Sequence, residues 1–102
     1  MAKGKTFTIH PDDRAHRILQ VLEENPIGLG RNEVESMSGV SFRSDAAPLM
    51  GLLRVGYISH ELRGGYLITP KGSEALGRLN RGEFVRGLGE GEWEDYFSSR
   101  TW

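Results

Sequence analysis

The sequence contains residue types found in catalytic and metal sites, but not in the spacing that such chemistry requires. The three histidines, His10, His16 and His60, share no metal-ligand spacing, and the 102 residues include no cysteine. No serine occupies a nucleophile elbow, and no glycine-rich loop follows a strand and opens a helix as a phosphate-binding loop does. We therefore expect no enzyme activity, no metal and no cofactor.

Arginines and lysines offer a different chemistry, the binding of phosphate groups. Arg31 precedes one expected helix, Arg43 precedes another, and Arg63 lies in a glycine turn. The whole chain has a net charge of −1, which argues against a nucleic-acid-binding surface. However, residues 1–82 carry 11 basic and 9 acidic side chains, a net charge of +2, whereas residues 83–102 carry 2 and 5, a net charge of −3. The body of the protein is therefore mildly basic and its C-terminal segment is acidic.

The composition, with 37% hydrophobic and 26% charged residues, is typical of one globular domain. Residues 6–10 alternate between polar and apolar, which predicts a short strand. A first helix begins after the cap Asp12 or Asp13, ends near residues 25–26, and buries Ala15, Ile18, Leu19 and Leu22. Asn32 followed by Glu35 is typical of a capping box, and the second helix that it opens is expected to bury Val34 and Met37.

A third helix is expected to start no earlier than about Ser44, because Pro48 is tolerated only in a first turn, and to end near Val55. Its expected inward residues are Ala46, Leu49, Met50 and Leu53. Two β-rich runs, residues 57–62 and 66–69, flank an Arg-Gly-Gly turn and predict a hairpin. Thr69 and Pro70 open a fourth helix, which buries Ala75, Leu76 and Leu79, and an extra helical turn is expected at Phe84, Val85 and Leu88.

This order of elements resembles the winged helix-turn-helix superfamily over about residues 12–80. The resemblance is carried by residues 32–39, by the turn Gly39-Val40-Ser41, by residues 49–58, and by residues 65–76, which are similar to the second wing strand and following helix of MarR-like bacterial and archaeal regulators. It implies an α+β, mainly α, fold: a three-helix core, a two-stranded β wing and an additional C-terminal helix. The winged-helix domain would span residues 1–82, with its core at 12–80.

The resemblance further implies a DNA-binding transcriptional regulator, with the third helix in the major groove and the wing tip on the flanking minor groove or phosphates. Such regulators commonly bind palindromic operators as homodimers, so the expected partners are double-stranded DNA and a second copy of the chain. A cytoplasmic protein with no membrane association is expected, since no apolar run approaches membrane-spanning length. The expected DNA-binding residues are Arg31, Ser41, Arg43, Ser44, Arg54, His60, Arg63 and Lys71.

Two questions stay open at the level of sequence. The outward positions of the third helix, namely Asp45, Ala47, Pro48, Gly51 and Arg54, offer few groups that read base edges. The alternative function is therefore a protein-interaction module with little or no DNA binding, such as a phage or archaeal adaptor. Residues 83–102 form an acidic, aromatic C-terminal extension with two possible roles. Its aromatic side chains could pack on the domain itself or on a second copy. Alternatively, the acidic segment could compete with nucleic acid for the basic body of the protein, or recruit a partner.

The first prediction concerns assembly. The apolar residues beyond the minimal domain need a surface against which they can be buried. We therefore expect a homodimer formed through the first strand or first helix together with the C-terminal segment. Light scattering at micromolar concentration should give twice the chain mass of 11.4 kDa. A mass of 11.4 kDa under these conditions would contradict the dimer.

Overall fold

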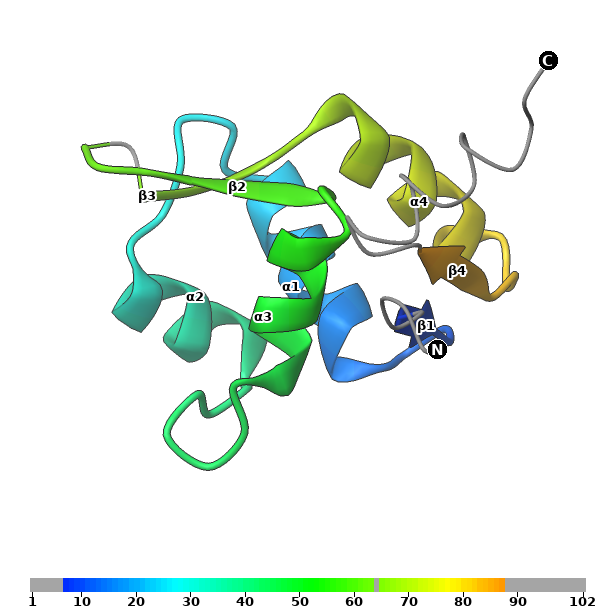
Figure 1. The fold of residues 1–102 in the computed structure, drawn as a ribbon, viewed down its shortest axis with the longest axis horizontal. Coiled ribbons are helices and arrows are strands. Elements are labelled where there is room, and N and C mark those ends of the chain that lie inside the picture. The colour runs from blue at the N-terminus through cyan, green and yellow to red at the C-terminus, as the bar shows by residue number, and fades with distance from the viewer. Residues whose placement is uncertain (1–6, 64, 88–102) are drawn as a thin grey trace, which may run out of the picture.

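The computed structural model describes residues 7–63 and 65–87, which fold into a small α+β domain (Figure 1). Within these ranges, four helices and two two-stranded antiparallel sheets, β1–β4 and β2–β3, are present. The α+β class, the four helices in their expected order and the hairpin are confirmed. No helix in this part of the chain is both long and apolar enough to cross a membrane. The elements are β1 (Phe7–Ile9), α1 (Arg14–Glu23), α2 (Arg31–Ser38), α3 (Ala47–Arg54), β2 (Ile58–Glu61), β3 (Gly65–Ile68), α4 (Pro70–Asn80) and β4 (Val85–Gly87).

Helix α1 lies at the centre of the domain and contacts α2, α3, α4 and β3. Its buried residues spread over roughly 220° of the helix circumference, at 3.6 residues per turn, which is wider than the face of an ordinary surface helix. The other elements cover this arc and complete the core. The buried residues of α1 are Ala15, His16, Ile18, Leu19, Val21 and Leu22.

His16 is a buried polar residue that joins the two ends of the fold. Its Nδ1 accepts a hydrogen bond from the backbone N–H of Asp12 at 2.9 Å, which places the ring proton on Nε2. Nε2 then donates to Oδ1 of Asn80, also at 2.9 Å. One ring nitrogen therefore ties α1 to the segment that leads into it, and the other attaches α1 to the end of α4.

The β2–β3 hairpin is attached to the connection between α1 and α2. Leu29 and Tyr66 form an isolated antiparallel bridge, in which the Tyr66 N–H donates to the Leu29 carbonyl at 2.7 Å and the Leu29 N–H donates to the Tyr66 carbonyl at 3.1 Å. Gly65 permits this approach, because its φ is +71° and a β-carbon there would collide with the Leu29 carbonyl. The position of the hairpin is thereby fixed by backbone hydrogen bonds to the α1–α2 connection as well as by the pairing of its own two strands.

The first and last described elements pair with each other. In the β1–β4 sheet, Phe7 lies opposite Gly87 and Ile9 opposite Val85. The expected helical turn at Phe84 and Val85 is therefore wrong: the buried Val85 belongs to a strand, because pairing with β1 satisfies its backbone. The third residue of that expected turn, Leu88, lies outside the described residues. Strand β4 falls within the segment that we named the C-terminal extension.

The start of the third helix agrees with the bound that Pro48 sets, but its inward face differs from expectation. Helix α3 begins at Ala47, no earlier than Ser44, and residues 42–44 before it form a turn in which the side chain of Phe42 is buried in the core. Leu49 and Leu52 are its fully buried leucines, and the ring of Phe7 packs over Gly51. These contacts fix the inward face, so Met50, expected to be buried, is 54% exposed.

Two expectations for the second helix are wrong as well. Val34 and Ser38, four residues apart, take the inward positions of α2, which leaves Met37 53% exposed. The helix is capped by Gly30 rather than by Asn32. The carboxylate of Glu33 accepts a hydrogen bond from the Gly30 N–H at 2.8 Å.

We predict that Gly65→Ala destabilises the domain far more than Gly82→Ala. Both glycines have positive φ, +71° and +87°, but a β-carbon at Gly82 would meet no atom within 4 Å. A left-handed conformation costs an alanine about 1–2 kcal/mol, whereas Gly65→Ala also breaks the bridge to Leu29 and should cost about 3 kcal/mol or more. The free energies of unfolding in urea measure the difference, and equal losses in both variants would show that the bridge contributes nothing.

Candidate nucleic-acid interface

The predicted site residues are all exposed and fall into two groups and one outlier. Five belong to α2, α3 and their connection: Arg31, Ser41, Arg43, Ser44 and Arg54. His60 and Arg63 belong to the hairpin, which projects past α2 in Figure 1. Lys71 is separated from them, because it lies at the base of the hairpin with its Nζ 5.9 Å from the centre of the Tyr57 ring.

Arg43 and Ser44 are not at the N-terminus of the third helix, where they could have acted together with its free backbone amides. They lie in the turn that precedes α3, where the hydroxyl of Ser44 donates to that of Ser41 at 3.4 Å. The backbone amides at the helix start are approached instead by Asp45, whose Oδ1 accepts from the Ala47 N–H at 3.1 Å. The turn thus presents the Arg43 side chain without help from the helix N-terminus.

The α2–α3 connection is shaped by Phe42. Its side chain is buried, and its backbone N–H donates to the carboxylate of Glu35 on α2 at 2.5 Å. The guanidinium of Arg31 lies over the Phe42 ring, 5.6 Å from the ring centre. One aromatic side chain therefore anchors the turn in the core and supports an arginine at the start of α2.

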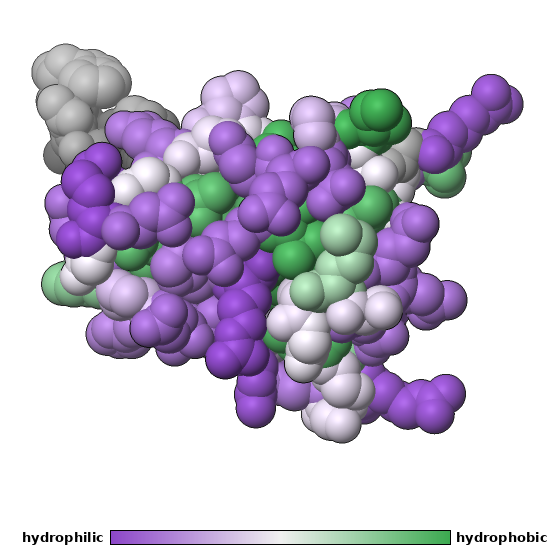
Figure 2. Space-filling view, turned by 180° about the vertical axis from the view of Figure 1, so that it is seen from behind, coloured by the Kyte–Doolittle hydropathy of each residue, from purple (hydrophilic) through white to green (hydrophobic). Residues whose placement is uncertain are grey.

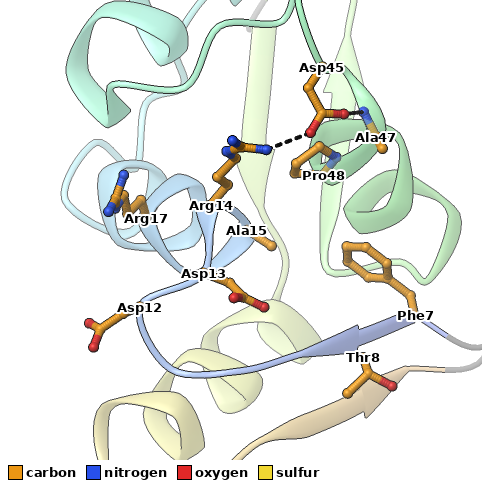
Figure 3. Close-up of a pocket in the computed structure, with 10 residues that line it drawn as sticks. All are labelled: Phe7, Thr8, Asp12, Asp13, Arg14, Ala15, Arg17, Asp45, Ala47 and Pro48. Carbon is orange, nitrogen blue, oxygen red and sulfur yellow. Dashed lines mark hydrogen bonds and ion pairs between the residues drawn. The ribbon is translucent and has the colours of Figure 1, made fainter.

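A shallow open pocket of about 510 Å³ lies beside this surface, between β1, the start of α1 and the start of α3 (Figure 3). Arg14 points to Asp45 there, and their side chains form an ion pair of 2.7 Å. Asp13 accepts a hydrogen bond from the His10 N–H, and Asp12 points away from the ion pair. The carboxylates do not converge, and no group of three or more potential metal ligands occurs among the described residues.

Some arginines of the domain are paired with carboxylates and others are not. Arg78 of α4 and Arg81 directly after it both donate to the carboxylate of Glu83, each at 3.3 Å, and these bonds, that of Arg78 foremost, lower the pKa of Glu83. Arg14 of α1 is paired with Asp45. Within the described residues, no carboxylate lies within 4 Å of Arg31, Arg43, Arg54 or Arg63, nor of Arg17 in α1 or Arg86 in β4.

The two acidic residues of α2 are engaged by the backbone. Glu33 accepts from Gly30, and Glu35 accepts from Phe42. Carboxylates held in this way serve to build α2 and its following turn rather than to pair with arginine. The α2–α3 unit and the hairpin therefore present positive side chains that could approach phosphates. Seen from behind the view of Figure 1, the surface is mostly hydrophilic, with apolar residues visible between the polar side chains (Figure 2).

No protein-family model matches this chain, and no curated protein and no solved structure is significantly similar to it. The functional argument consequently rests on the geometry and charges of the chain itself. Sequence reasoning missed two residues that shape the surface, Phe42 and the exposed Met50. Phe42 carried a usable signal, since it is an apolar residue within the polar stretch 41–45 and so needs a place in the core.

We predict that Glu35→Ala loosens the turn before α3. The variant removes a charge-assisted acceptor for the Phe42 N–H and should lower the free energy of unfolding by about 2 kcal/mol. Hydrogen exchange of the Phe42 amide should accelerate more than that of amides in α4. Glu35→Gln, which keeps an acceptor, and Ser36→Ala, which alters an exposed neighbour, are the controls. Unchanged protection of the Phe42 amide in Glu35→Ala would contradict the role of this bond.

Proposed function

We propose that this protein is a DNA-binding transcriptional regulator of the winged helix-turn-helix type that acts as a homodimer on double-stranded DNA. The observation that carries the proposal is that every arginine of the α2–α3 unit and the hairpin, namely Arg31, Arg43, Arg54 and Arg63, has no carboxylate within 4 Å in the described chain. Arg17 of α1 and Arg86 of β4 share this property, whereas Arg14 is paired with Asp45, and Arg78 and Arg81 are paired with Glu83. Arginines whose charge is not already neutralised are suited to phosphate contacts.

The arrangement of the elements supports the same function. The order α1, α2, α3, β2, β3 corresponds to three helices followed by a wing. The Leu29–Tyr66 bridge attaches the hairpin to the connection that leads into α2, so helices and hairpin can approach a duplex as one body. An eight-residue helix such as α3 is about 12 Å long and fits the major groove of B-form DNA.

Each site residue then has a defined role in the proposal. Helix α3 enters the major groove, and Arg54 at its end reaches a base edge or a phosphate. Arg31 and Arg43 bind the backbone on either side of α2, and the hydroxyls of the turn add hydrogen bonds there. Arg63 enters the flanking minor groove, where its charge suits a narrow groove with strong negative potential. Lys71 binds phosphate near the base of the hairpin, and His60, stacked on Tyr66 at 4.3 Å, stiffens the wing.

A second candidate function, a protein-interaction module, is favoured by one observation. Four large apolar side chains are more than half exposed on or beside the same elements: Ile27, Met37, Met50 and Leu62. Exposed apolar groups of this kind are common at protein interfaces. In that case the arginines would serve solubility or partner specificity, and binding to duplex DNA would be absent at moderate salt.

We predict that Arg63→Glu weakens binding to duplex DNA and flattens the dependence of the logarithm of the binding constant on the logarithm of salt by about one to two phosphate contacts. Fluorescence anisotropy with a labelled duplex at several salt concentrations measures both quantities. Arg86→Glu, the same charge change on an exposed residue of β4, is the matched control and should alter binding less.

Thermal stability should hardly change in Arg63→Glu, because the side chain is exposed at the hairpin tip. Equal effects of the two substitutions would remove the hairpin from the interface. Absence of salt-dependent binding by the unmodified protein would overturn the DNA proposal and favour the protein-interaction module.

A further inference from the structure

The exposed face of α3 is narrow and almost free of hydrogen-bonding groups. Ala47, Met50 and Arg54 are its exposed residues, and they lie within roughly 60° of one another on the helix circumference. Leu49 and Leu52 point into the core, and Phe7 covers Gly51. A duplex that accepts α3 in its major groove would thus meet the methyl group of an alanine and the thioether of a methionine, with Arg54 as the polar side chain at the end of the face.

These side chains match one feature of the major groove. The exposed groups there are hydrogen-bond donors and acceptors, except for the C5-methyl group of thymine. Neither alanine nor methionine offers a donor to a base edge, and both pack well against a methyl group. Methionine is especially suited to this contact, because its flexible chain adapts to the shape of an apolar surface.

The charges around this stripe, the exposed apolar side chains of Ala47 and Met50 on α3, favour DNA rather than a second protein as the partner that binds there. Arg54 closes the stripe at the end of α3, and Arg43 lies in the turn before its start. Neither has a carboxylate partner within 4 Å among the described residues. An apolar strip with an unneutralised cation beyond each end complements a groove whose floor carries methyl groups and whose walls carry phosphates.

We propose that α3 recognises thymine methyl groups, with Met50 as the principal contact and Ala47 as a second. The protein would then prefer A·T-rich duplexes and would select them by apolar contact rather than by base hydrogen bonds. Arg63 on the hairpin favours the same sequences, since A-tracts have the narrow minor groove that attracts arginine. This inference rests on the DNA binding proposed above and adds the class of sequence that is bound.

The test compares two duplexes of one A·T-rich sequence, the first with thymine and the second with deoxyuridine at every thymine position. The two differ in the C5-methyl groups and keep the same hydrogen-bonding edges. The unmodified protein should bind the thymine duplex more tightly, by about fourfold for each methyl group that it buries. In Met50→Ala the ratio of the two affinities should fall toward one, while Met50→Leu should retain most of it.

Met37→Ala is the matched control, because it removes an equally exposed methionine from α2 and should leave the ratio unchanged. Circular dichroism checks that the variants fold, as expected for exposed positions. Equal affinity of the unmodified protein for both duplexes would overturn the inference while leaving DNA binding in place. A full thymine preference in Met50→Ala would also overturn it, as would an equal loss of preference in Met37→Ala. Absence of binding to the thymine duplex would instead overturn the proposed function itself.

Discussion

The fold depends on covering the wide buried arc of α1. Six of its ten residues are buried, and no single neighbour can shield them all. Three helices and one strand of the hairpin are therefore required around it. Within this arc the histidine of the core is satisfied on both sides, by the backbone that leads into α1 and by the last residue of α4. Polar groups buried in this manner would be costly without their partners, so they also fix how the helices are placed.

Two hydrogen-bonded attachments around that core shape the candidate interface. The bridge between Leu29 and Tyr66 carries the hairpin to the helices, and the bond from the Phe42 amide to Glu35 shapes the turn before α3. Each uses a backbone group that would otherwise need water or another partner. Together they make α2, α3 and the hairpin into one surface rather than three separate projections. A binding surface with this support can meet a rigid duplex at little cost in conformational entropy.

The electrostatic organisation shows why net charge is a weak guide to function here. The chain as a whole is slightly acidic, yet the carboxylates of α2 are engaged by backbone amides and that of Glu83 by two arginines at the end of α4 and directly after it. The arginines of α2, α3 and the hairpin keep their charge available. A count of charges cannot reveal this, because it does not distinguish a carboxylate that caps a helix from one that pairs with a cation.

The sequence by itself determined the class of fold, the four helices in order and the hairpin. These follow from local physics: apolar spacing, a proline at the first position of α4 beside a threonine cap, and glycines at the hairpin turn. The tertiary structure decided what depends on contacts between distant residues. Phe7 covers Gly51 and turns Met50 outward, Phe42 enters the core from the turn before α3, and β1 recruits Val85 into a strand. Each is a competition for a place in one small core. Local spacing cannot settle it, because Gly51 and Val85 are 44 or more positions away in the chain from the β1 residues that they contact, and Phe42 lies in a turn with no periodic pattern.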